Sequence, residues 1–203
     1  ETDLPVHQAS VNLANIRTNT DPTPEVASDT IHRTCANGNP LVCVQNAVDG
    51  LDQTEFRAAN VVNTQIPGCP TPPGGERWYR INFGRLVELH AVHIAWGEPC
   101  FGTNYAVLTT TEETPPCPAR EDPSWETVAS VPDDAIPNTG DGGLDAISLV
   151  TDGEGKEARW LSLIFVSPGD SGEGEGCTET GPQFVIQELK VYGTRDLSTD
   201  SCR

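Results

Sequence analysis

Several features common in other classes of protein are missing from this 203-residue chain. It contains no methionine, no Asn-x-Ser/Thr sequon, and no apolar segment long enough for a signal sequence or a membrane span. The missing sequon excludes N-glycosylation at a standard acceptor site. The chain begins with Glu1, so we expect a mature, secreted protein from which a targeting peptide has been removed.

Positive charge is scarce. Twelve Lys and Arg residues face 30 Asp and Glu residues, which gives a formal net charge of −18, and only Lys156 and Lys190 are lysines. Nucleic acids and anionic membranes are bound by cationic side chains that displace counterions, so both would be poor partners. Divalent cations and neutral ligands such as sugars remain compatible with this charge.

Long helical patterns are also missing, since 17 prolines and 19 glycines are spread along the chain. Alternating apolar residues instead predict strands, separated by turn-rich loops, at 77–84, 87–96, 104–110, 124–131, 144–150, 158–166 and 183–193. Successive strands without helices between them predict an all-β antiparallel sandwich or barrel with little helix. The alternation changes phase around His90 and Ala91, which predicts a bulge or bend there. His90 and His93 are expected on opposite faces of this strand, where they cannot bind one metal ion.

The seven cysteines lack the Cys-x-x-Cys spacing of zinc and redox sites, so we expect disulfides and an oxidising compartment. Four of them lie in or beside three long loops, 57–76, 111–123 and 167–182. The short, turn-rich spacer between Cys35 and Cys43 favours the pair Cys35–Cys43. Cys100 and Cys117 flank the segment YAVLTT and its following loop, so we expect them to pair, and Cys69 would then join Cys177 across two long loops. The remaining Cys202 is expected to pair with another domain or chain.

The stretch NAVDGLDQTEF (46–56) is rich in oxygen donors around an Asp-Gly turn. Calcium binds six to eight oxygens, and a tight turn lets consecutive residues face one ion. The candidate ligands are Asn46, Asp49, Asp52 and Thr54. The alternative interpretation is an ordinary turn with solvated acids, which this composition also fits.

The order of segments resembles the coagulation factor V/VIII type C, or discoidin, domain family, which includes the family 32 carbohydrate-binding modules. The matching segments run from about residue 11 to residue 194: VNLANIR, NAVDGLDQTEF, RWYRINFGRLVELHAVHIAWG, YAVLTT with SWETVASV, ARWLSLIF and VIQELKVYGT. The resemblance implies a galactose-binding-like jelly-roll sandwich of about eight strands. We therefore expect one domain over 1–203, with its core at 11–194 and a tail at 195–203.

The resemblance also implies two sites. In many members a structural calcium in the loop of Asp49 is also bound by a Glu of the last strand, which corresponds here to Glu188. Members bind ligands at one end of the sandwich, through loops equivalent to 57–65, 97–103 and 167–182. Sugar recognition uses aromatic faces and planar polar groups, so the candidates are Arg57, Asn60, Asn63, Glu98, Phe101 and Asn104. Ordinary solvated loop residues would look the same.

The four tryptophans lie in predicted strands and are expected in the core or at its rim rather than as sugar platforms. No Ser/His/Asp or Cys/His arrangement and no phosphate-binding loop is apparent, so we expect no enzymatic activity. These observations predict a secreted, non-catalytic glycan-binding module with structural calcium. The alternatives are an adhesive or structural module that contacts extracellular proteins, and a targeting module attached to an enzyme.

Overall fold

The computed structural model describes residues 11–19, 22–28, 44–51, 56–58, 69, 76–97, 100–131, 143–170 and 184–195. Nine strands form one sheet in which every pairing is antiparallel. They are β1 (Val11–Asn12), β2 (Glu25–Ser28), β3 (Phe56–Ala58), β4 (Arg77–Trp96), β5 (Cys100–Thr110), β6 (Glu126–Val131), β7 (Leu144–Ser148), β8 (Lys156–Asp170) and β9 (Phe184–Arg195). Helical structure in these ranges is confined to residues 44–48, including the 3₁₀ helix η2 (Asn46–Val48). The predicted all-β antiparallel fold is confirmed, and no helix in the described part is long and apolar enough to span a membrane.

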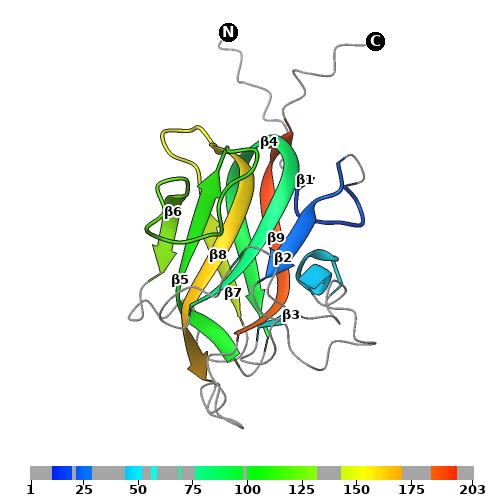
Figure 1. Ribbon diagram of the computed structural model, residues 1–203. Helices are drawn as coiled ribbons and strands as arrows, with labels where there is room; N and C mark the ends of the chain where they lie inside the picture. The colour runs from blue at the N-terminus through cyan, green and yellow to red at the C-terminus, as the bar shows by residue number, and fades with distance from the viewer. Residues whose placement is uncertain are drawn as a thin grey trace, which may run out of the picture.

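The long strand β4 belongs to both layers of the sandwich (Figure 1). Its first part, 77–82, pairs with β2 and β8, and β5 and β6 extend this layer beyond β8. Its last part, 91–96, pairs with β7 and β9, and β9 also carries the short strands β1 and β3. The sheet therefore folds over on itself through β4.

A bulge in β4 lets this strand serve both layers. Its register against β9 shifts between Leu89 and Ala91, and buried residues change from Val87 and Leu89 to Val92 and Ile94. The predicted bulge is confirmed. One expectation is wrong as a result: the phase shift leaves both His90 and His93 half-buried on the side away from the core. His90 Nε2 lies 3.5 Å from Glu88 Oε1 and the His93 ring packs on Tyr192, and neither belongs to a metal-binding group in the described ranges.

The inter-layer core, named here for the buried residues between the two layers, is rich in aromatic rings. Phe165 of β8 stacks on Phe184 of β9 with ring centroids 4.8 Å apart, and Trp96 of β4 lies 5.4 Å from Tyr105 of β5. Asp145 of β7 accepts hydrogen bonds at Oδ2 from Trp96 Nε1 (2.7 Å) and from the Tyr105 hydroxyl (2.6 Å). Burial and then Asp145 raise the pKa of Tyr105, so its hydroxyl remains a proton donor to this carboxylate.

A second cluster, here called the outer core, lies on the other face of β5 and β8. It consists of Cys69, Trp78, Ala106, Leu108, Trp125 and Ile164. Strand β5 is consequently buried on both faces, and the segment 111–125 contributes Cys117 and Trp125 to this cluster. The predicted placement of the tryptophans is confirmed, since three are buried and Trp160 is half-buried.

The disulfide of the outer core corrects the predicted pairing. Cys69 is bonded to Cys117, with Cα atoms 5.3 Å apart, so the pairs Cys69–Cys177 and Cys100–Cys117 are wrong. The physical reason is that Cys117 packs against the outer face of the sheet, where it meets Cys69. Cys100 begins β5, and the remaining cysteines, Cys35, Cys43, Cys177 and Cys202, lie outside the described residues.

Candidate functional site

The strand ends that carry the predicted ligand loops lie together, at the lower end of the sandwich in Figure 1. Ala58 at the end of β3 pairs with Phe184 at the start of β9, and Cys100 pairs with Asp170 at the end of β8. The Gly97 N–H, just past β4, donates to the Val185 carbonyl over 2.9 Å. The three predicted ligand loops therefore start from one end of the sandwich, which is called the loop end below.

Of the six predicted ligand residues, Phe101 is corrected by the structure. It lies in β5 opposite Gly169, is 6% exposed, and belongs to the inter-layer core, so it presents no free face to a sugar. Asn104 is half-buried, and its Oδ1 accepts a hydrogen bond from Arg120 Nη2 over 3.1 Å. Arg57 pairs with Val185 through its backbone, while its side chain and the residues Asn60, Asn63 and Glu98 lie outside the described part.

Asp49 and Glu188, predicted as calcium ligands, are buried side by side near η2. They are 6% and 3% exposed, and the Gly50 N–H donates to Glu188 Oε2 over 3.2 Å. Asp49 Oδ1 accepts from the Leu51 N–H, and its Oδ2 lies 3.7 Å from Nη2 of Arg17, whose side chain is 57% exposed. Burial, followed by the charges of Glu188 and Asp49, raises the pKa of the Tyr79 hydroxyl well above its ordinary value. The charges of Asp49 and Glu188 therefore both reach the buried Tyr79 hydroxyl.

Local structure explains why the chain holds Asp49 there. Gly50 has a φ of 75°, a left-handed backbone conformation that favours glycine. A Cβ at this position would lie 2.7 Å from Asn15 Nδ2, so a larger residue would also displace the Asn15 side chain. The Ile16 N–H donates to the Val48 carbonyl over 3.2 Å. The segment after β1, the turn after η2 and strand β9 thus meet at one point.

The carboxylate oxygens of Asp49 and Glu188 are donors of the type that a hard cation prefers. Two buried carboxylates concentrate negative charge where water is largely excluded, and oxygen is the ligand atom that calcium prefers. Asn46 is half-buried in η2 beside them, while Asp52 and Thr54 lie outside the described residues. No group of three or more His, Cys, Asp or Glu side chains in the described ranges is arranged to hold a metal, so a complete shell requires further oxygens such as those of Asp52, Thr54 and backbone carbonyls.

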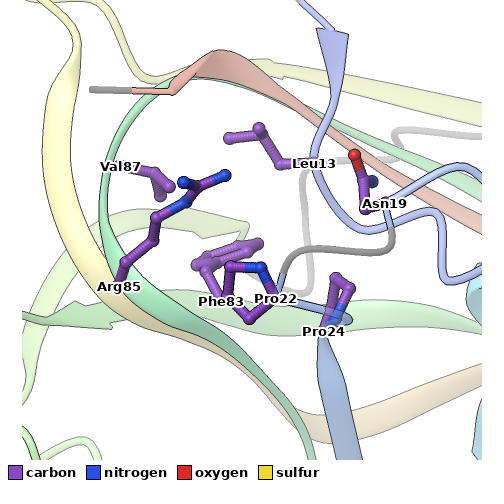
Figure 2. Close-up of a pocket in the computed structure, with 7 residues that line it drawn as sticks. All are labelled: Leu13, Asn19, Pro22, Pro24, Phe83, Arg85 and Val87. Atoms are coloured by element: carbon purple, nitrogen blue, oxygen red, sulfur yellow. The ribbon is translucent and has the colours of Figure 1, made fainter. Parts of the chain in front are cut away.

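Two hollows that the described residues line occur at the end of the sandwich opposite the loop end, and sequence reasoning missed both. The smaller, between Phe83, Arg85 and the prolines Pro22 and Pro24, holds about 10 Å³, enough for about one water molecule (Figure 2). The larger is a groove of about 260 Å³ beside the end of β5, with Glu112, Glu126 and Glu157 among its lining residues. The run of threonine and glutamate at 109–113 is the one sequence signal that marks it.

No protein-family model matches the sequence. The search of curated proteins finds no match either. The solved structures do match. Chitosan-binding module 1 from the chitosanase/glucanase of Paenibacillus sp. IK-5 is 19% identical, with 90% of this chain and 99% of that chain covered and a TM-score of 0.57. This chain has the fold of that module and of the family 32 carbohydrate-binding modules.

Two family 32 modules from C. perfringens show the same agreement. The module of NanJ, solved in complex with galactose, is 13% identical, with 91% of this chain and 98% of that chain covered and a TM-score of 0.54. The module CpGH89CBM32-5, in complex with GalNAc-β-1,3-galactose, is 11% identical, with 90% of this chain and 99% of that chain covered and a TM-score of 0.54. The galactose-binding-like sandwich predicted from segment order is confirmed.

Proposed function

We propose that this chain is a secreted, non-catalytic glycan-binding module stabilised by calcium. The observation that carries this proposal is the match of its fold, over about nine-tenths of its length, to modules solved with sugars bound. The net charge of −18 supports a ligand that is neutral or cationic, because it disfavours anionic polymers.

The proposed binding face is the loop end. Three segments begin there from strands fixed by backbone pairing, which is the rigid support that a recognition loop needs. Arg57, Asn60, Asn63, Glu98 and Asn104 supply planar donors and acceptors suited to pairs of sugar hydroxyls. Phe101 supports the site from the core and takes no part in stacking.

Calorimetry with galactose, GalNAc-β-1,3-galactose and chitotriose, at millimolar ligand and with calcium present, tests this function. We expect at least one of them to bind with a dissociation constant in the micromolar to millimolar range. Arg57→Ala should weaken that binding at least fivefold, whereas Arg159→Ala, a charge change on β8 away from the loop end, should leave it unchanged. Absence of binding on a broad glycan array, together with capture of an extracellular protein through the loop end, would favour the adhesive alternative.

Calcium would be held by Asp49 and Glu188, with Asn46, Asp52 and Thr54 as further oxygen donors. Its expected role is structural, because it would neutralise two buried carboxylates that join β9 to the turn after η2. A ligand at one hundred times its dissociation constant stabilises the folded state by about 2.7 kcal/mol. We therefore expect a chelator to lower the melting temperature of the protein by several degrees.

The control is a pair of single variants. Asp49→Asn should abolish the chelator effect, while Asp152→Asn, an exposed acid in the turn before β8, should retain it. A melting temperature that does not respond to chelator in the unmodified protein would contradict the calcium site and leave the glycan proposal in place.

A further inference from the structure

The connection from β4 to β5 crosses from one layer of the sandwich to the other at the loop end. The last part of β4, 91–96, pairs with β7 and β9, whereas β5 pairs with β8 and β6. Among the described residues, β4 and β5 share no backbone pairing. Residues 97–99 join the two strands and include the predicted ligand residue Glu98. Side-chain contacts, rather than pairing of β4 with β5, therefore hold the two strand ends together.

Asp145 of β7 bonds to both strand ends. Its Oδ2 accepts a hydrogen bond of 2.7 Å from Nε1 of Trp96, the last residue of β4, and one of 2.6 Å from the hydroxyl of Tyr105 in β5. Hydrogen bonds to a carboxylate are stronger than those between neutral groups. The two rings also meet edge to face, with centroids 5.4 Å apart. Asp145, Trp96 and Tyr105, called the clasp below, therefore link the second layer to the first.

The clasp also contacts Gly102, near the start of β5. A Cβ on Gly102 would lie 2.7 Å from Trp96 Cη2 and 3.2 Å from Tyr105 Cδ1, so both rings lie against this glycine. Trp96 precedes the connection 97–99 in the chain, and its ring packs on the strand that follows the connection. The orientation of this ring therefore affects how far apart the two ends of the connection lie.

The carboxylate of Asp145 is an unusual group for this part of the core. The residue is 5% exposed, and its second oxygen, Oδ1, has no hydrogen-bond partner among the described residues. Removal of a carboxylate from water carries a large desolvation penalty, and well-packed apolar residues often stabilise such a position at least as well. The geometry that Asp145 imposes on Trp96 and Tyr105 therefore explains this residue better than stability does.

We infer that Asp145 is a positioning residue for glycan binding at the loop end. By fixing Trp96 against Tyr105 and Gly102, the clasp holds the connection 97–99 in one arrangement before the ligand arrives. A preorganised loop binds more tightly, because the entropy of ordering it no longer opposes binding. The inference rests on the proposed glycan-binding function and adds to it a buried residue that acts through its neighbours.

The test measures by calorimetry how variants of the clasp bind galactose, GalNAc-β-1,3-galactose and chitotriose. Asp145→Leu removes the acceptor, and each sugar that binds the unmodified protein should bind about fivefold to tenfold more weakly, because the connection must then be ordered on binding. Tyr105→Phe keeps the ring and removes one hydrogen bond, so the loss should be about threefold. Asp145→Asn retains an acceptor oxygen for both donors and should bind within about twofold of the unmodified protein.

Amide hydrogen exchange measures the effect on the connection without a ligand. The Gly97 N–H donates to the Val185 carbonyl over 2.9 Å, and its exchange should accelerate by about tenfold in Asp145→Leu. The Leu13 N–H donates to the Val191 carbonyl over 2.7 Å at the opposite end of the sandwich, and its exchange should stay close to the original rate. Tyr105→Phe should change the two rates in the same directions, and it carries both tests if Asp145→Leu does not fold.

The matched control is Leu161→Ala, which shortens a fully buried residue of the same core opposite Thr109, toward the other end of β5. This variant should destabilise the protein and leave sugar binding unchanged. The positioning role is overturned if Leu161→Ala weakens binding as much as Asp145→Leu does, because general destabilisation would then explain the loss. It is also overturned if Asp145→Asn binds as weakly as Asp145→Leu, or if Asp145→Leu binds as tightly as the unmodified protein.

Failure of the proposed function gives a different result. If none of the sugars binds the unmodified protein, the glycan proposal fails, and the exchange rate of Gly97 decides the role of the clasp alone. Faster exchange in Asp145→Leu would support the positioning of the connection 97–99, and an unchanged rate would overturn it.

Discussion

The inter-layer core and the outer core are closed in different ways. The inter-layer core lies between two layers of one continuous sheet, so strands cover it on both sides, and rings from β4, β5, β8 and β9 interlock within it. Among the described residues, the outer core has strands on one side only, and its cover includes the segment 111–125, which a disulfide ties to Cys69. One sheet can therefore be buried on both faces: strands cover its inner face, and a segment held by a disulfide covers part of its outer face.

The largest effect is expected from Phe165→Ala in the inter-layer core. Phe165 is fully buried between Phe184 and Trp96, so its removal leaves a cavity that the rigid sheet cannot close. The free energy of unfolding should fall by about 3–5 kcal/mol, measured by urea denaturation. The neighbouring Ile164 faces the outer core, and Ile164→Ala should cost less because the covering segment can settle into the space. A larger loss from Ile164→Ala would reverse the comparison.

Removal of the disulfide by Cys69→Ala/Cys117→Ala should have the next largest effect. The bridge closes a loop over a sequence separation of 48 residues, and such a link contributes about 2–4 kcal/mol to the free energy of unfolding. The loss should be concentrated in the outer core, so acrylamide should quench Trp125 fluorescence more strongly while Trp96 remains protected. Single Trp125→Phe and Trp96→Phe variants show how much of the fluorescence and of its quenching each tryptophan contributes. Equal quenching of both tryptophans would show that the two cores open together.

A smaller effect is expected from Arg80→Met at the rim of the outer core. The guanidinium carbon of Arg80 lies 5.2 Å from the ring centroid of Trp78 and 5.1 Å from that of Trp160. Partial burial lowers the pKa of Arg80, while the charge of Glu25 raises it. An arginine side chain stays protonated in proteins, so the cation persists. Methionine keeps the apolar stem and loses both cation–π contacts, and we expect a loss of about 1–2 kcal/mol. Arg159→Met, which removes a weak exposed contact to the Gly84 carbonyl, should cost less than half as much.

The smallest change, and the one of opposite sign, is expected from Thr109→Val. Valine has the shape of threonine without the unpartnered hydroxyl, so the free energy of unfolding should rise by up to about 1 kcal/mol in the absence of ligand. Thr110→Val is the matched control, because the Thr110 hydroxyl accepts a hydrogen bond and its loss should destabilise the protein. Equal destabilisation by both variants would show that the Thr109 hydroxyl is satisfied in solution.

The sequence predicted the strands well because half-buried strands leave an alternating pattern. The period-two segments coincide with β4 to β9, and the phase change near His90 marks the bulge by which β4 enters the second layer. The short strands β1, β2 and β3 carry too few residues to leave such a pattern. The resemblance predicts Phe101 in a ligand loop at 97–103, yet pairing of β5 with β8 continues through Phe101 and Gly169.

The sites were predicted unevenly. The proximity of Asp49 and Glu188 followed from resemblance to a family with a known topology, since no local pattern joins residues so far apart. The disulfide between Cys69 and Cys117 depends on a loop packing over the outer face, which spacing between cysteines does not encode. The groove beside Thr109 was missed for the same reason, because its walls come from three segments that only the folded sheet brings together.

The pairing of β1 with the far end of β9 determines how this module would face its surroundings. Val11 lies opposite Gly193, so the first and last described strands reach the same end of the sandwich, away from the loop end. A tether joined on either side of these strands would hold the molecule by that end, with the loop end directed outward. Immobilisation through one such tether should therefore leave the loop end accessible to a polysaccharide surface, whichever side of the chain carries it.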